Sequence, residues 1–126
     1  MTPISVSPAT LDGLEATGAW DELRDVIPRL EELRRGYPML DALAERAHGR
    51  TLLAAGEEQD GIAALRRAIS AFDRLPVPFE AARSREALAD AVPAEARGLL
   101  EAAVEAYRKL RAAPHLDRAQ HRLSAL

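Results

Sequence analysis

Apolar side chains recur along most of the chain at intervals of three or four residues, the spacing of one face of an α-helix. Glycine and proline interrupt this pattern at short intervals, and both residues are typical of helix ends and turns. The pattern predicts seven helices joined by short turns, over residues 8–18, 20–35, 39–56, 57–75, 79–91, 93–112 and 114–126. Such a series leaves no room for a β-sheet, so we expect an all-α fold.

The composition agrees with a helical core made of small side chains. Hydrophobic residues make up 48% of the 126 residues, whereas aromatic residues make up only 4%. The core must therefore consist mainly of Ala, Leu, Val and Ile, among which Ala and Leu favour helices. A chain of this length can bury roughly two-thirds of the surface that it exposes when unfolded, which suffices for one compact domain.

One pattern of side-chain types occurs twice along the chain. The stretch GIAALRRAISAF, which begins at Gly61, returns thirty-five residues later as ARGLLEAAVEAY. At this spacing Ile62, Leu65, Ala68, Phe72 and Leu75 correspond to Arg97, Leu100, Ala103, Tyr107 and Leu110. Four of the five pairs keep the same type of side chain. Periods of this length mark repeats of a helix pair, in which neighbouring pairs supply the core that one pair cannot bury alone.

The run HGRTLLAAGEEQDGIAALRRA resembles a tetratricopeptide repeat (TPR). Gly49 stands where the two helices of such a pair touch, and Gly61 stands on the second helix. The next unit has Ser84 and Ala96 at the equivalent places. The resemblance covers about residues 40–126. It implies a TPR-like, right-handed helical-repeat array of about seven antiparallel helices, with small side chains where two helices approach closely.

The chain departs from the usual repeat pattern at two kinds of position. The family usually has a large apolar residue immediately before the small one, whereas this chain has His48, Arg83 and Arg118 there. Glu45 and Glu80 replace the usual aromatic residue three positions earlier. The predicted repeats are therefore divergent.

The resemblance implies a single helical-repeat domain with five segments. These are an extended N-terminus at 1–7, a first helix pair at 8–36, TPR-like units at 39–75 and 78–112, and a capping helix at 114–126.

The segment LRRAISAFDRLPVPFEAARSREALADAV is similar to the helical repeats of large ATPase-containing LuxR-type (MalT-like) transcription regulators of bacteria. In that family the repeats lie between a nucleotide-binding region and a DNA-binding helix-turn-helix. Neither a phosphate-binding GxxxxGK loop nor a basic recognition helix occurs here, so the resemblance implies only the repeat portion. The expected function is a non-catalytic protein-interaction or regulatory module. A self-associating, homodimeric scaffold is the alternative, because the ends of a repeat array expose apolar surface unless they are capped.

The first helix of each tetratricopeptide pair lines a concave groove, and this groove is the expected partner site. Aligning Gly49 and Ser84 to the family places six residues toward it, Leu43, Arg46, Arg50, Leu53, Arg85 and Leu88, with Gln120 as a further candidate. The three arginines are suited to grip a carboxylate or an acidic segment of a protein or peptide by bidentate hydrogen bonds. The alternative is that each arginine pairs with a nearby acid such as Glu45 or Glu86.

No residue pattern indicates catalysis, so we expect no enzyme activity, no cofactor and no metal. The chain has no cysteine, which excludes thiolate zinc sites and cysteine nucleophiles. Glu45 and His48 form one E-x-x-H unit, but di-iron bundles use two such units. Adjacent carboxylates such as Glu57 and Glu58 point about 100° apart on a helix and cannot readily share a proton.

Charge and the length of apolar runs exclude two classes of partner. The formal net charge is −3, and acidic and basic side chains alternate along the chain, so we expect no direct binding to nucleic acid. No apolar stretch approaches the ~18 residues that a membrane span needs. Residues 1–7 lack the basic start and apolar run of a signal peptide. We therefore expect a cytoplasmic chain that does not bind membranes.

Overall fold

The computed structural model describes Arg24 and residues 37–126, and within these residues it contains helices and no β-strand. The α-helices are α3 (Pro38–Ala54), α4 (Glu58–Arg74), α5 (Pro78–Ala91), α6 (Ala96–Leu110) and α7 (Ala113–Ser124), and the short 3-10 helix η1 (Pro93–Glu95) precedes α6. The described part of the chain is thus all-α, as the sequence predicts.

Most of the described helix ends lie close to their predicted positions, with one difference in α6. The segment predicted as one helix over 93–112 begins as η1 and ends at Leu110. It ends early because Arg111 adopts the left-handed conformation, with φ 56°, which terminates the helix. The predicted segments 1–7 and 8–36 lie outside the described residues apart from Arg24, and with them two of the seven predicted helices.

Proline and glycine explain where the helices begin and end. Pro38, Pro78 and Pro114 each lie in the first turn of a helix, where the missing N–H has no intrahelical partner to lose. Gly56, in the turn after α3, has a φ of 84°, which glycine adopts without the steric penalty of a side chain.

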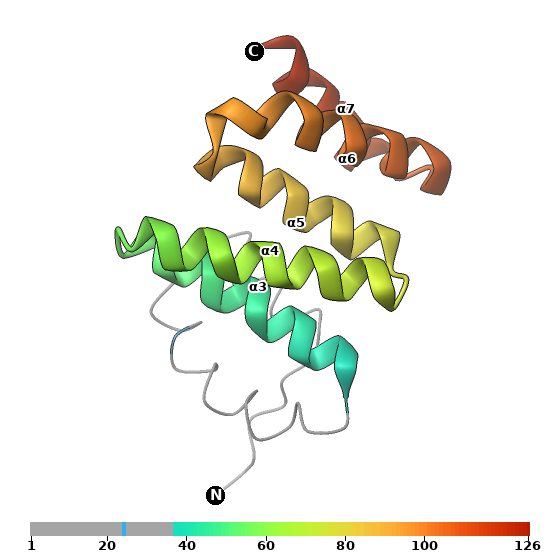
Figure 1. Cartoon of the computed structure of the whole chain (residues 1–126). Coiled ribbons are helices and arrows are strands. Elements are labelled where there is room, and N and C mark those ends of the chain that lie inside the picture. The colour runs from blue at the N-terminus through green and yellow to red at the C-terminus, as the bar shows by residue number, and fades with distance from the viewer. Residues whose placement is uncertain (1–23, 25–36) are drawn as a thin grey trace, which may run out of the picture.

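Consecutive helices pack against one another and run in opposite directions, which gives the stack seen in Figure 1. The most extensive contacts join α3 with α4, α4 with α5, α5 with α6, and α6 with α7. Helices α3 and α5 also contact each other directly. Each helix therefore packs mainly on the helix that precedes or follows it in sequence.

Three of the five pairs thirty-five residues apart are buried in both copies, whereas Ile62 and Leu75 are half-buried and their counterparts Arg97 and Leu110 are exposed. Phe72 and Tyr107 are both 0% exposed, as the repeat register predicts. Leu65 and Leu100 are also fully buried, and each packs among alanine and leucine side chains of neighbouring helices. The three pairs that are buried in both copies thus contribute to the core between the helices.

The close contact predicted between Gly49 and Gly61 is confirmed. A Cβ atom built on Gly49 would lie 2.9 Å from the carbonyl oxygen of Gly61, and one built on Gly61 would lie 2.9 Å from that of Gly49. Real Cβ atoms essentially never come this close, so the two backbones meet only because both residues lack a side chain. The corresponding residues of the next pair, Ser84 and Ala96, are both buried.

Candidate functional site

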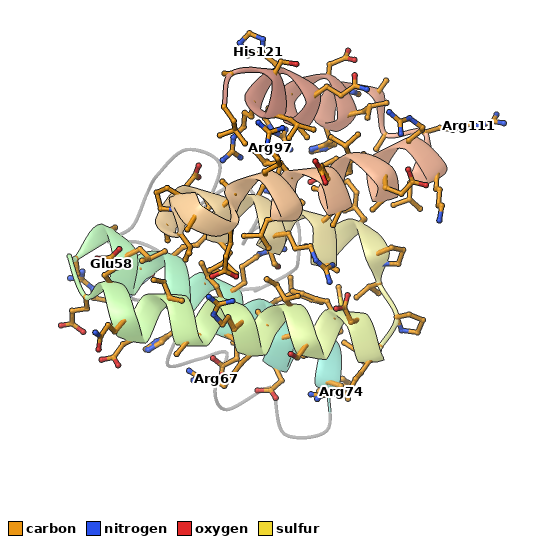
Figure 2. The ribbon with its side chains drawn as sticks, turned by 45° about the horizontal axis from the view of Figure 1, so that its top comes forward. Glu58, Arg67, Arg74, Arg97, Arg111 and His121 are labelled. Carbon is orange, nitrogen blue, oxygen red and sulfur yellow. The ribbon has the colours of Figure 1, made fainter. Side chains whose placement is uncertain are left out.

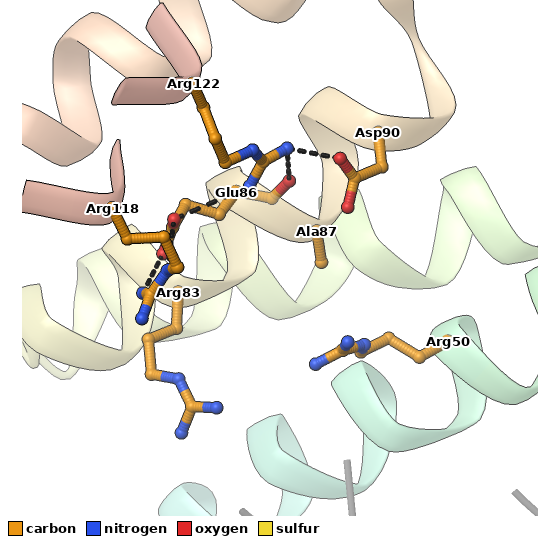
Figure 3. Close-up of a pocket in the computed structure, with 7 residues that line it drawn as sticks. All are labelled: Arg50, Arg83, Glu86, Ala87, Asp90, Arg118 and Arg122. Carbon is orange, nitrogen blue, oxygen red and sulfur yellow. Dashed lines mark hydrogen bonds and ion pairs between the residues drawn. The ribbon is translucent and has the colours of Figure 1, made fainter. Parts of the chain in front are cut away.

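A cavity of ≈ 310 Å³ opens on the face of the stack to which α3, α5 and α7 contribute (Figure 3). Its lining residues are Arg50 from α3, Arg83, Glu86, Ala87 and Asp90 from α5, and Arg118 and Arg122 from α7. None of these lining residues comes from α4 or α6. Alternate helices of the stack therefore build this cavity together, and we call it the arginine cavity.

The carboxylate of Glu86 lies at the centre of the contacts between α5 and α7. Its side chain is only 7% exposed and accepts a 2.5 Å hydrogen bond from the hydroxyl of Tyr107. Arg118 donates to it twice, from Nε at 3.1 Å and from Nη2 at 2.7 Å. Such a bidentate, charge-assisted pair fixes both the distance and the orientation of the two groups. Glu86 thus positions Arg118 at the edge of the cavity.

Arg122 forms a second bridge between the same two helices, as Figure 3 shows. Its guanidinium group bonds to Asp90, and it also lies 3.5 Å from Oε1 of Glu86 and 3.4 Å from the backbone carbonyl oxygen of Glu86. The Asp90 side chain is 71% exposed, whereas that of Arg122 is 29% exposed. Asp90 therefore lies at the mouth of the cavity, in reach of solvent.

Burial and hydrogen bonding set the protonation states of this cluster. Burial would raise the pKa of Glu86, but hydrogen bonds from Arg118 and Tyr107 more than offset it, and the pKa lies below its usual value. Burial and the hydrogen bond to Glu86 raise the pKa of Tyr107. The hydrogen bond to Glu86 likewise raises the pKa of Arg118. Near neutral pH the cluster therefore consists of a carboxylate, a neutral phenol and guanidinium cations.

An aromatic group supports the cluster from the side of α6. The ring of Tyr107 lies 5.9 Å from that of Phe79 and 5.4 Å from that of His115. Phe79 and His115 meet edge to face at 4.9 Å, and Nη2 of Arg118 lies 2.9 Å from Nδ1 of His115. Rings at these separations contribute packing beyond their buried area, so α5, α6 and α7 hold Arg118 in place together.

The structure does not bring the three predicted arginines, Arg46, Arg50 and Arg85, into one cavity. Arg50 lines the arginine cavity. Arg46 is 1% exposed, bonds to Glu80 of α5 and lies 5.5 Å from the centre of the Phe72 ring. These positions differ from the expectation because Arg46 meets a carboxylate on the neighbouring helix.

Most of the remaining predicted groove residues lie in the core or in an ion pair, and Leu53 lines a cavity. Arg85 bonds to Asp73 of α4 at 3.2 and 2.7 Å and does not line the arginine cavity, so the alternative expectation, pairing with a nearby acid, is the one seen for this arginine. Leu43 and Leu88 are each 1% exposed and belong to the core. Leu53 is partly exposed and lines a cavity next to Arg50. Gln120 is half-buried on α7, outside the lining of the arginine cavity. Partner binding by any of these residues stays a prediction.

Sequence reasoning missed the residues that form most of the cavity. Glu86 and Asp90 lie four residues apart on α5, and Arg118 and Arg122 lie four residues apart on α7. Residues with this spacing share one helix face, so the two pairs form matched acidic and basic stripes. This complementarity of stripes thirty-two residues apart is the signal that could have identified the contact.

Neither a metal site nor a membrane span occurs among the residues that the structure describes. No group of three or more His, Asp or Glu side chains there is arranged to hold a metal ion. Glu45 of the E-x-x-H unit accepts a hydrogen bond from Arg67, and His48 is exposed. None of the helices in this part of the chain is both long and apolar enough to cross a membrane.

The arginine cavity is thus a cationic site on a scaffold of small apolar side chains. It presents four guanidinium groups and two carboxylates on three helices. Guanidinium groups match the geometry of carboxylates and phosphates through their planar fork of donors. The chain matches no protein-family model, and no curated protein or solved structure is significantly similar to it.

Proposed function

We propose that the chain is a non-catalytic protein-interaction module that binds an acidic segment of a partner protein in the arginine cavity. The observation that carries this proposal is the lining of the cavity, in which arginines from three alternate helices outnumber the carboxylates. A partner carboxylate would meet a surface lined by four arginines and two carboxylates.

The exposure of the arginines supports binding from solution. The side chain of Arg118 is 46% exposed although it is paired with Glu86, and that of Arg122 is 29% exposed. A guanidinium group has five N–H donors, more than one carboxylate can accept. Groups held in this way are pre-organised, because little side-chain freedom is left to lose when a ligand binds.

The helices that form the cavity also agree with the TPR resemblance. In a tetratricopeptide array the first helix of each pair lines the partner groove, and α3, α5 and α7 occupy these positions in the proposed register. The placement of the chain among bacterial LuxR-type regulators rests on the sequence resemblance, and within this proposal the chain supplies their partner-binding repeats.

A labelled acidic peptide tests the proposal directly. The probe is a fluorescein-labelled peptide of six glutamates, and fluorescence anisotropy measures its dissociation constant. Replacing Arg50→Gln together with Arg83→Gln removes two cavity cations from α3 and α5. The affinity should fall at least about tenfold, since hydrogen bonds to charged groups contribute about 1.5–3 kcal/mol each. Affinity of the unaltered chain should also decrease as salt rises.

A matched variant controls for the loss of two positive charges. Arg74→Gln with Arg97→Gln makes the same change in net charge on α4 and α6, which do not line the cavity (Figure 2). This control should bind the peptide as tightly as the unaltered chain. If both variants bound the peptide equally weakly, the interaction would be non-specific charge attraction. Unchanged affinity in the cavity variant would contradict the proposal. A mass measurement in solution distinguishes the module from the homodimeric scaffold.

A further inference from the structure

The arginine cavity is one end of a longer groove. A second cavity, of ≈ 280 Å³, shares Arg50, Ala87 and Asp90 with it and adds Leu53 and Ala54. A third cavity, of ≈ 460 Å³, shares Leu53 and Asp90 with the second and continues to Gly56, Glu58, Ala91 and Pro93. Because neighbouring cavities share lining residues, they form one continuous groove between α3 and α5, toward their C-terminal ends.

The chemistry of the groove changes along its length. Arginines dominate the end near α7, and Leu53, Ala54 and Ala87 provide an apolar stretch in the middle. Glu58, which is exposed, lies at the far end. Asp90 lines all three cavities, and Arg50 also lines the middle one. A ligand that extends along the groove therefore meets four arginines first, then apolar side chains beside Arg50 and Asp90, and then the further carboxylate of Glu58.

We infer that the partner segment is a mixed peptide, with acidic side chains in the arginine cavity and a large apolar side chain on Leu53, Ala54 and Ala87. This inference rests on the proposed function and specifies its ligand. Ala54 and Ala87 are small and leave room beside Leu53, whose side chain is only partly buried. An apolar side chain of the ligand placed there would remove its own surface and that of the apolar stretch from water, which is favourable.

The far end of the groove argues against a uniformly charged ligand. A run of acidic residues, or the regular phosphates of a nucleic acid, would bring negative charge toward Glu58. Like charges at short range repel. A uniformly anionic strand would therefore be attracted by the arginines at one end of the groove and repelled by Glu58 at the other. A segment in which apolar residues follow the acidic ones avoids this repulsion.

Two peptides that differ only in their apolar part test this inference. One has three glutamates followed by two leucines, the other has serines in place of the leucines, and both carry fluorescein. The leucine peptide should bind about tenfold more tightly, as expected when one large apolar side chain is buried. Ala54→Gln introduces a neutral polar side chain into the apolar stretch and should remove most of this advantage. Ala63→Gln, at an exposed alanine of α4 outside the groove, should preserve it.

The outcomes separate the two proposals. Equal affinity for both peptides, with binding that still depends on Arg50 and Arg83, overturns the mixed-ligand inference and leaves the proposed function standing. A leucine advantage that survives Ala54→Gln unchanged overturns the assigned apolar stretch. Failure of both peptides to bind, while the six-glutamate peptide binds through Arg50 and Arg83, overturns the mixed-ligand inference alone, and failure of all three peptides overturns both proposals. An oligonucleotide of equal charge that binds as tightly as the leucine peptide overturns the choice of a peptide ligand.

Discussion

At the scale of single residues, Gly49 decides how closely α3 and α4 can approach. Gly49→Ala would place a Cβ atom 2.9 Å from the carbonyl oxygen of Gly61, and a backbone atom cannot move aside as a flexible side chain can. The two helices must then separate, which should lower the free energy of unfolding by about 1–3 kcal/mol, in the range of other overpacked cores. Urea unfolding followed by circular dichroism measures this change.

Gly98→Ala is the matched control for the Gly49 prediction. Gly98 is an exposed residue of α6, and a Cβ atom built there meets nothing within 4 Å. Alanine should therefore raise stability by about 0.5–1 kcal/mol, because it loses less backbone freedom on folding than glycine does. Equal effects of both substitutions would mean that the α3–α4 contact is not as tight as described.

The buried pair of Arg46 and Glu80 gives a second prediction at this scale. Glu80→Ala would remove the carboxylate to which the guanidinium group of Arg46, 1% exposed, bonds, and should destabilise the chain by about 3–5 kcal/mol. Arg46→Met combined with Glu80→Leu replaces both charges by apolar groups and should recover most of that loss. Urea unfolding of the three chains tests this. A double variant less stable than Glu80→Ala alone would contradict the explanation.

At the scale of the helix, α7 depends on the carboxylate of Glu86. The pKa of Glu86 is lowered in the folded chain, so folding favours its charged form. The resulting stability is present above the ordinary pKa of 4.5 and is lost as the pH falls below this value toward the folded pKa. Glu86→Gln should lower stability by about 1.5–3 kcal/mol at neutral pH. It should also flatten the decline in stability on acidification, measured by urea unfolding between pH 7 and pH 3.

Amide hydrogen exchange locates this effect within the chain. In Glu86→Gln the amides of α7 should exchange faster than those of α4, because the bonds from Arg118 and Arg122 join α7 to α5. Glu105→Gln alters an exposed carboxylate of α6 and serves as the control. If the two variants gave the same exchange pattern, the Glu86 cluster would not be what holds α7 in place.

The sequence predicts the described helices far better than it predicts the site. Proline in the first turn and glycine in the turns act locally, so helix ends such as Pro78 could be found without knowing the fold. The prediction of the Gly49 contact rested on the resemblance to a tetratricopeptide repeat, in which a small residue stands where the two helices of a pair touch. In contrast, the carboxylate that each arginine meets depends on how helices cross. Arg46 reaches Glu80 and Arg85 reaches Asp73, so neither enters the predicted groove.

At the scale of the whole molecule, α7 closes one end of the described stack with a polar surface. Asp117, His121 and Ser124 are exposed on this helix, whereas Ala119 is fully buried. These polar side chains give a second copy little apolar surface to contact at this helix, and the role of residues 114–126 as a capping helix stays a prediction.

The packing of each helix on its neighbour in sequence affects how fast the chain folds. Contacts between residues close in sequence form without closing long loops, and helical domains rich in such contacts fold in microseconds to milliseconds. Stopped-flow refolding from urea should therefore be complete for the main phase within milliseconds. The prolines in the helix turns add a slower phase of about 10–100 s after long unfolding, which a prolyl isomerase should accelerate. Nascent chains of this protein would thus form the arginine cavity almost as soon as α7 is available to pair with α5.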